Sequence, residues 1–177
     1  LRALQSAQAL DELGGRLAEA RAALRGPTAA GGPPLLLKIA PDLDADEIEA
    51  IVHRAARHGF DGLIVSNTTV SRPPGLHGGA VDETGGLSGE PLFALSTRVL
   101  AEVAAAARGT GLTLVAAGGV GSGADVLAKL RAGASAVQLY TALIYAGPGL
   151  VPRLRRDLRQ RLQADGFRSV AEAVGAG

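Results

Sequence analysis

The chain has 177 residues, of which 47% are hydrophobic and 3% aromatic, and its formal net charge is +1 at pH 7. These values indicate one folded domain with a core built mainly from Leu, Val, Ile and Ala, and no general attraction to nucleic acid. Because the chain contains no cysteine, disulfides, thiolate zinc sites and a cysteine nucleophile are excluded. No apolar run reaches the roughly 18 residues of a membrane span.

The first third of the chain predicts a helix, a strand and a second helix. The first helix covers Asp11–Leu24, where apolar residues recur at helical spacing, and a loop rich in Gly and Pro follows it. The short apolar strand Leu35–Ala40 comes next. The second helix begins after Asp44, which forms a capping-box pattern with Glu47.

The same alternation continues to the end of the chain. A long loop, Thr68–Glu90, separates the second strand from the helix that Pro91 opens. Further helices are expected from Ser122, from Pro148 and over residues 169–175. The remaining strands are expected over Gly62–Asn67, Leu112–Gly119 and Ala136–Leu143.

Strands that alternate with helices predict an α/β fold, with a parallel sheet under helical cover. The strands are nearly continuous apolar runs, as expected where both faces of a sheet are buried. The chain holds four such units, whereas a complete (β/α)8 TIM barrel needs about 250 residues. We therefore predict that residues 1–177 are the C-terminal half of a single (β/α)8 barrel domain. A four-stranded doubly wound sheet is the alternative, disfavoured because no G-x-G-x-x-G follows the first strand.

Lys38 is the sharpest candidate for a binding residue, because it lies within an apolar strand, where a lysine buried without a partner is very costly. It is either a lysine that reaches an ion pair or solvent, or a cation that faces a bound anion in the barrel mouth. Two loop segments are weaker candidates. The polar run Ser66–Thr69 follows the second strand, where barrels place their active sites, and the glycine-rich run Thr84–Gly89 precedes a helix.

Two adjacent glycines, Gly118 and Gly119, end the third strand just before a short helix. A glycine turn that leads to a helix N-terminus is a ready anion site. If the four strands are the fifth to eighth of a barrel, this turn follows the seventh. Tyr140 and Thr141 then lie at the end of the eighth, and both places would converge on one phosphate. The alternative is a pair of ordinary turn glycines.

The remaining charged residues give no comparable signal. His53 and His58 are expected on the surface of their helix, and His77 has no companion typical of a metal site, so no metal is expected. The last helix has a basic face, which we interpret as solvated rather than as a nucleic-acid patch, because Asp157 interrupts it and aromatic residues are absent. Its arginines are Arg153, Arg155, Arg156, Arg159 and Arg161.

Five motifs occur in an order and spacing that resemble the dihydroorotate dehydrogenase family, its quinone-dependent class 2 in particular. They are KIAPDL, SNTT, TGGLSG, LVAAGGVGSGADVLAKLRAGA and VQLYTALIYAGP, and together they extend over essentially the whole chain. The resemblance implies an FMN-binding barrel that oxidises dihydroorotate to orotate in pyrimidine (UMP) biosynthesis, with a quinone as electron acceptor. It also implies a peripheral location on the cytoplasmic side of the cell membrane.

The resemblance further implies roles for individual residues. Lys38 would lie beside the N1–O2 edge of the flavin, where reduced flavin carries negative charge, and Asn67 and Thr68 would contact the substrate. The implied flavin contacts are Ser66, Gly89 and Gly119, with Tyr140 and Thr141 as phosphate ligands.

The family's catalytic base is a serine that the resemblance places upstream of Leu1. The first four strands would lie there too, with an N-terminal extension that forms the quinone tunnel and contacts the membrane. The chain alone would then be inactive. Two other hypotheses stay open at this point. One is a phosphate-binding barrel isomerase or synthase, and the other is a non-catalytic half-barrel that dimerises to close its sheet.

Overall fold

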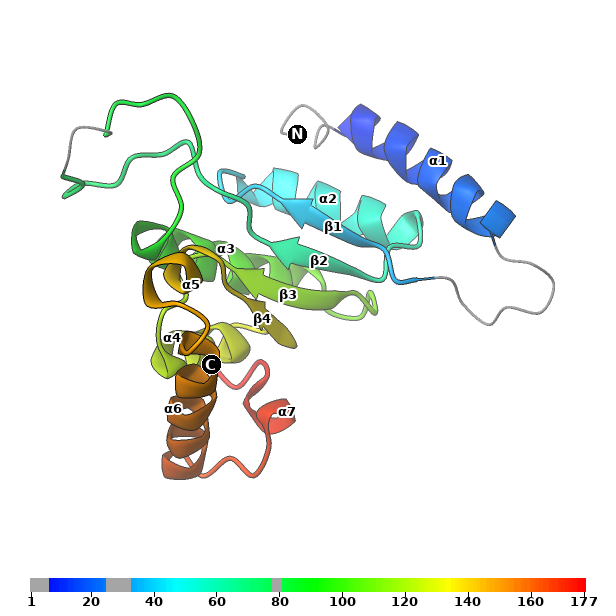
Figure 1. Cartoon of the computed structure of the whole chain (residues 1–177). Coiled ribbons are helices and arrows are strands. Elements are labelled where there is room, and N and C mark those ends of the chain that lie inside the picture. Colours follow the sequence, from blue (N-terminus) through cyan, green and yellow to red (C-terminus); the bar gives the residue numbers. More distant parts are fainter. Residues whose placement is uncertain (1–6, 25–32, 78–80) are drawn as a thin grey trace.

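The computed structural model of the chain describes residues 7–24, 33–77 and 81–177. Its centre is a four-stranded parallel sheet with the sequential strand order β1-β2-β3-β4 (Figure 1). The strands are β1 (Leu36–Ile39), β2 (Gly62–Val65), β3 (Thr113–Ala117) and β4 (Ala136–Gln138).

Helices connect the strands and flank the sheet (Figure 1). A sequential order of parallel strands joined by helices is the topology of a barrel segment, and it contradicts the doubly wound alternative, in which the strand order reverses. The helices are α1 (Ala7–Leu24), α2 (Ala45–Arg57), α3 (Phe93–Ala106), α4 (Gly123–Arg131), α5 (Thr141–Ala146), α6 (Leu150–Ala164) and α7 (Val170–Ala173), and the 3-10 turn η2 (Glu90–Leu92) leads into α3.

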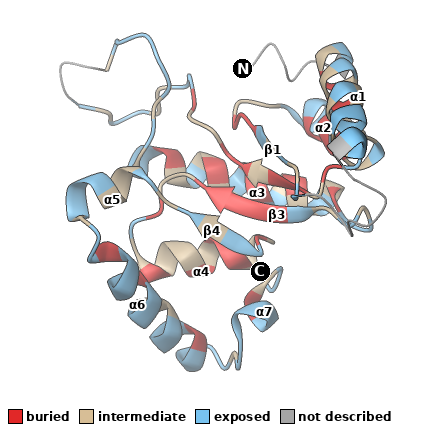
Figure 2. Cartoon of the chain, turned by 45° about the vertical axis from the view of Figure 1, so that its right-hand side comes forward, coloured by how far each residue is buried: buried red, intermediate tan, exposed pale blue. Residues whose placement is uncertain are grey.

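The main core lies between one face of the sheet and the helices packed on it. Leu63 and Val65 of β2 are fully buried there, together with Val52 of α2 and Val99 of α3. The strand residues in this core alternate, as Leu63 and Val65 do in β2 and Leu114 and Ala116 do in β3, because successive side chains of a strand point to opposite faces. Figure 2 shows the resulting concentration of buried residues along β3 and the adjoining side of α3.

The opposite face of the sheet is only partly covered. Leu36 and Lys38 of β1, and Ala136 and Gln138 of β4, are exposed. The expectation that both faces are buried is therefore wrong for this chain. The apolar residues of the strands suit a sheet that is covered on both faces, whereas the described helices cover only one face.

Local signals set most element boundaries. The capping box of α2 is confirmed, because the Asp44 carboxylate accepts from the Glu47 N–H at 2.8 Å and the Glu47 carboxylate accepts from the Asp44 N–H at 3.0 Å. The predicted strand Ala136–Leu143 is too long. Gln138 pairs with Ala117, the last residue of β3, so beyond it the chain has no neighbouring strand and turns into α5.

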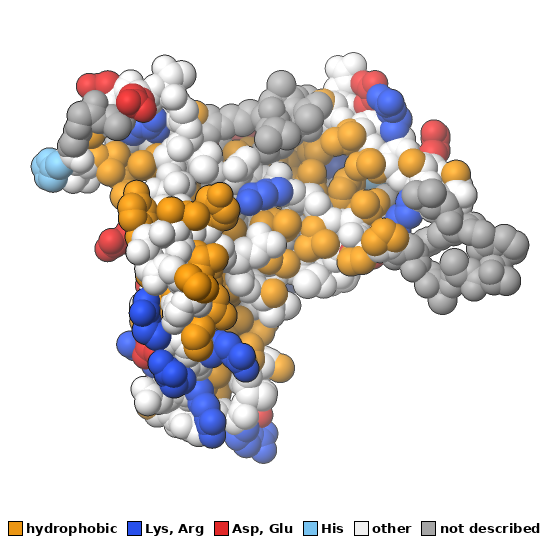
Figure 3. Space-filling model, in the orientation of Figure 1, with side chains coloured by type: hydrophobic (Ala, Val, Ile, Leu, Met, Phe, Trp, Pro, Cys, Tyr) orange, Lys and Arg blue, Asp and Glu red, His pale blue; other side chains and the backbone are white. Residues whose placement is uncertain are grey.

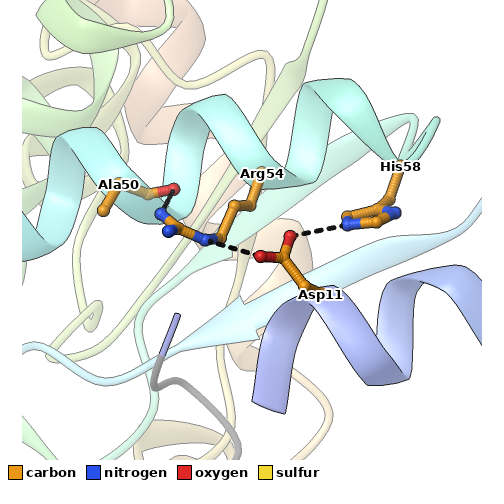
Figure 4. Close-up of polar contacts among 4 residues, drawn as sticks. All are labelled: Asp11, Ala50, Arg54 and His58. Carbon is orange, nitrogen blue, oxygen red and sulfur yellow. Dashed lines mark hydrogen bonds and ion pairs between the residues drawn. The ribbon is translucent and has the colours of Figure 1, made fainter. Parts of the chain in front are cut away.

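Asp11 fastens α1 to α2, as Figure 4 shows. Its carboxylate lies 2.8 Å from Nε2 of His58 and 3.4 Å from Nε of Arg54. The hydrogen bond to His58 is the largest cause that holds the pKa of Asp11 below its usual value of 3.8, and the charge of Arg54 adds to it. The side chain of His58 is only 16% exposed, so its expected surface position is wrong, whereas His53 is exposed as predicted.

Gly14 and Gly15 of α1 provide a matched test of this helix contact. A methyl group on Gly14 would lie 2.6 Å from Cγ of His58, whereas one on Gly15 would meet no atom within 4 Å. We expect Gly15→Ala to raise the free energy of unfolding by up to about 1 kcal/mol, because alanine favours a helix. Gly14→Ala should lower it by about 1–3 kcal/mol through overpacking. Urea unfolding measures both, and equal stabilisation by the two variants would show that α1 does not pack on α2.

Candidate functional site

The carboxyl ends of the four strands open into one cleft of about 1460 Å³. Parallel strands bring their carboxyl ends to the same edge of a sheet, so loops that are far apart in the sequence meet there. The cleft is lined by all eight residues singled out from the sequence: Lys38, Ser66, Asn67, Thr68, Gly89, Gly119, Tyr140 and Thr141.

Lys38 reaches the cleft from β1, but it is not buried. It lies on the uncovered face of the sheet and is exposed, so the expectation of a desolvated cation is wrong. The physical reason is the alternation of the strand, in which Leu37 and Ile39 face the helices and Lys38 faces away. Among the described residues none forms a hydrogen bond or an ion pair with its ammonium group, which is available to a ligand.

The polar run after β2 is held in an extended path by its neighbours. The Ser66 N–H donates to the Ala117 carbonyl at 3.0 Å, and the Asn67 N–H donates to the Ile39 carbonyl at 2.8 Å. The Asn67 side-chain oxygen accepts from the Thr68 N–H at 2.9 Å, which turns the amide NH2 group away from the backbone. Asn67 therefore presents a donor at the cleft.

Asp42 and Arg72 brace this region, and the sequence reading missed both. Asp42 follows β1, and its carboxylate accepts from the hydroxyl groups of Thr69 and Ser71, at 2.9 Å for Ser71. Arg72 donates to backbone carbonyls further along the same loop, at 3.0 Å to Val81. The acidic residue in KIAPDL was the available signal, because a carboxylate just after a strand lies close to the polar loop of the next strand.

The two glycines after β3 are required by backbone geometry. Gly118 and Gly119 have φ of +110° and +76°, a region that favours glycine. A Cβ on Gly119 would lie 2.5 Å from Cα of Phe93, so the turn packs directly on the first residue of α3. In the described part of the chain, the N–H groups of Gly119 and Val120 find no acceptor.

The N-terminus of α4 is not the free anion site that the glycine pattern suggested. The Asp125 carboxylate accepts from the N–H groups of Gly121 and Ser122, at 3.0 and 2.8 Å. The Asp157 carboxylate of α6 accepts from the Gly123 N–H at 2.9 Å. Carboxylates already satisfy these donors, so a phosphate would meet negative charge there, and the free donors belong to the preceding turn.

The segment after β4 joins the cleft through the glycine-rich loop. Thr141 begins α5, and its hydroxyl donates to the hydroxyl of Ser88 at 3.1 Å. Gly89 has φ of +80°, and a Cβ there would lie 3.2 Å from the Thr141 methyl group. Tyr140 is 77% exposed, and Ile144 and Tyr145 of α5 are exposed too. Figure 3 shows hydrophobic side chains gathered on this face of the molecule.

Lys129, on α4, is a third residue that the sequence analysis missed. Its side chain is completely buried, and its Nζ lies 2.6 Å from the hydroxyl oxygen of Ser96 and 5.0 Å from the ring centre of Phe93. Burial lowers the pKa of Lys129 to about 8, against a weaker opposing attraction from Asp125. The available signal was composition, because Lys38 and Lys129 are the only lysines among 18 Lys and Arg residues.

None of the helices in the described part of the chain combines the length and the hydropathy of a membrane span. No group of three His, Asp or Glu side chains in the same part of the chain is placed to hold a metal ion.

Comparison with known proteins gives a consistent family. The family model described as dihydroorotate dehydrogenase matches residues 1–162. The dihydroorotate dehydrogenase (quinone) of Azorhizobium caulinodans is 57% identical over 150 residues, which are 85% of this chain and 42% of that protein. The same enzyme of Rhodospirillum rubrum and the mitochondrial one of Mus musculus are 51% and 49% identical, each over 99% of this chain and over 47% and 43% of their own lengths.

A solved structure confirms the predicted fold class. The ligand-free DHODH of Eimeria tenella superposes with a TM-score of 0.92 at 36% identity, over 99% of this chain and 51% of that one. The chain thus spans about half the length of the curated relatives it matches.

Gly119 and Gly121 offer a matched test of the turn. Gly119→Ala should lower the free energy of unfolding by about 2 kcal/mol or more, because a side chain meets both a left-handed φ and the backbone of Phe93. A Cβ on Gly121 would come no closer than 3.9 Å to Ala142, so Gly121→Ala should stay within about 0.5 kcal/mol. Thermal unfolding of both variants measures this, and equal effects would contradict the packing of the turn on α3.

Lys129 should make stability depend on pH in the alkaline range. Its pKa is about 8 in the folded chain and 10.5 when unperturbed, so between these values the unfolded chain binds more protons. The free energy of unfolding should therefore rise as pH increases from about 8 to 10.5, by roughly 3 kcal/mol in total. Urea unfolding across this range should show the rise in the natural sequence and not in Lys129→Met. Identical pH profiles for the natural sequence and Lys129→Met would contradict a desolvated ammonium group at Lys129.

Proposed function

The chain belongs to the dihydroorotate dehydrogenase family, and we propose that its protein oxidises dihydroorotate to orotate in pyrimidine (UMP) biosynthesis, with FMN as cofactor. A quinone would accept the electrons, as the names of the relatives suggest. The observation that carries this proposal is the cleft, which joins one free ammonium group, that of Lys38, to a glycine turn with unpaired backbone donors.

The residues of the cleft fit FMN, a ligand with a negative charge at each end when reduced. The ammonium of Lys38 would hold the N1–O2 edge of the flavin, where the charge of the reduced form gathers. The Gly119 N–H and the hydroxyl of Thr141 would bind the phosphate, because both lie at strand ends of the type that hold phosphate in barrels. Tyr140 would be a further phosphate ligand, and Ser66 and Gly89 complete the proposed flavin contacts.

Oxidation removes a proton from C5 and a hydride from C6 of dihydroorotate. Bound FMN would supply the acceptor for the hydride. The amide NH2 of Asn67 would orient the pyrimidine ring, because its oxygen is already committed to the Thr68 N–H. Thr68 packs tightly on the glycine-rich loop, with Gly86 so close that no Cβ would fit, and this contact would hold the Thr68 hydroxyl in place for the substrate.

Proton removal requires a base within hydrogen-bond reach. The two carboxylates among the described residues that line the cleft are Glu90 and Asp125, and Asp125 is engaged by the backbone of its own turn. We therefore propose that the base is a serine outside these 177 residues, as the family resemblance implies, and that the chain alone has no turnover. The quinone path and a peripheral place on the membrane are proposed for the same outside sequence.

A barrel isomerase or synthase would need only the phosphate turn and would leave Lys38 and Asn67 without a role. Membership of the dihydroorotate dehydrogenase family argues against it. The hypothesis of a half-barrel that dimerises concerns the isolated chain, in which β1 and β4 are the edge strands of the described sheet.

The protein expressed from its natural gene should be yellow from bound FMN. We expect Lys38→Met to bind reduced FMN about tenfold more weakly relative to oxidised FMN, which lowers the midpoint potential by about 30 mV. Spectroelectrochemical titration measures the shift. Arg108→Met removes the same charge from an exposed position outside the cleft and should leave the potential unchanged. A colourless protein that takes up no added FMN would overturn the proposed function.

A further inference from the structure

Lys129 is a buried ammonium group that the proposed chemistry does not use. Its side chain is fully buried, and Asp125 attracts its charge without an ion pair between the two in the described part of the chain. Its one hydrogen bond goes to Ser96 of α3, and the ring of Phe93 lies beside its Nζ. A methionine would fill a similar space without the cost of desolvating a charge, so packing alone does not account for a lysine here.

The hydroxyl of Ser96 links this ammonium to the cleft. Its oxygen accepts from Lys129 at 2.6 Å and lies 3.1 Å from the carbonyl oxygens of both Gly118 and Phe93. Because the ammonium group is only a donor, Ser96 must accept from it, and the single hydroxyl proton is then shared between the carbonyls of Gly118 and Phe93. Lys129 thereby fixes the hydroxyl that holds the carbonyl of Gly118.

The carbonyl of Gly118 belongs to the peptide group whose N–H is that of Gly119. Holding this carbonyl toward α3 directs the Gly119 N–H to the opposite side, where the cleft lies. Phe93 closes the arrangement, because its backbone touches Gly119 and its ring touches the ammonium. The same small cluster therefore sets the direction of the free donors and places a positive charge behind them.

We propose that Lys129 is a positioning residue for the phosphate end of the ligand, acting through Ser96 to aim the donors of the Gly118–Gly119 turn. This inference rests on the proposed FMN site. It differs from the role of Lys38, which would touch the flavin ring, because Lys129 is separated from the cleft by Ser96 and the turn. Its effect should therefore depend on whether the ligand carries a phosphate.

Riboflavin, which lacks the phosphate of FMN, provides the test. In apoprotein prepared from the natural gene product, we expect Lys129→Met to weaken FMN binding about tenfold and to change riboflavin binding less than about twofold. Ser96→Ala keeps the charge and removes the link, so it should weaken FMN in the same selective way by a smaller factor. It also keeps the test decisive if Lys129→Met fails to fold. Flavin fluorescence quenching gives both dissociation constants.

Leu162→Ala is the matched control, because Leu162 packs on α4 away from the turn and its loss destabilises the fold without touching Ser96. The FMN-to-riboflavin affinity ratio should stay at the natural value in this variant. An unchanged ratio in both Lys129→Met and Ser96→Ala would overturn the positioning role while leaving the FMN site intact. Failure of the natural protein to bind either flavin would instead overturn the proposed function, and this inference with it.

Discussion

The close approach of the Gly118–Gly119 turn to the first residue of α3 is the contact on which the cleft depends. Only a residue without a side chain can place its Cα against the backbone of Phe93 at a left-handed φ. This contact sets the depth of the cleft floor beside β3. The contact also leaves the N–H groups of Gly119 and Val120 without an acceptor in the described part of the chain.

The carboxylates around the cleft bind other groups and leave the N–H donors of the Gly118–Gly119 turn free. Asp125 and Asp157 bind the N–H groups at the start of α4, and Asp42 binds the hydroxyl groups of the loop after β2. Each carboxylate holds a segment that borders the cleft through at least one of its oxygens. Acidic residues therefore lie in the segments that border the cleft, whereas the ammonium group that Lys38 presents to a ligand is positively charged.

The sequence predicted the order of strands and helices, because apolar periodicity and capping residues are local signals that the fold obeys. Asp44 and Glu47 form the expected cap, and all eight candidate residues reach one cleft, since parallel topology fixes where strand ends lie. The failures are tertiary in origin. The end of β4 depends on where β3 stops, the exposure of Lys38 depends on which face the helices cover, and His58 is half-buried because Asp11 of α1 contacts it.

The two lysines of the chain differ in their surroundings. Lys38 lies on the open face, where solvent moderates its charge and its long side chain can adjust to a ligand. Lys129 is buried, so its charge is poorly screened and its position is fixed by Ser96 and Phe93. Arginine would not replace lysine equally well at either position, because its planar guanidinium needs more room and spreads its charge over five donors. A compact ammonium can hold a single hydroxyl, as Lys129 holds that of Ser96 beside the carbonyl of Gly118.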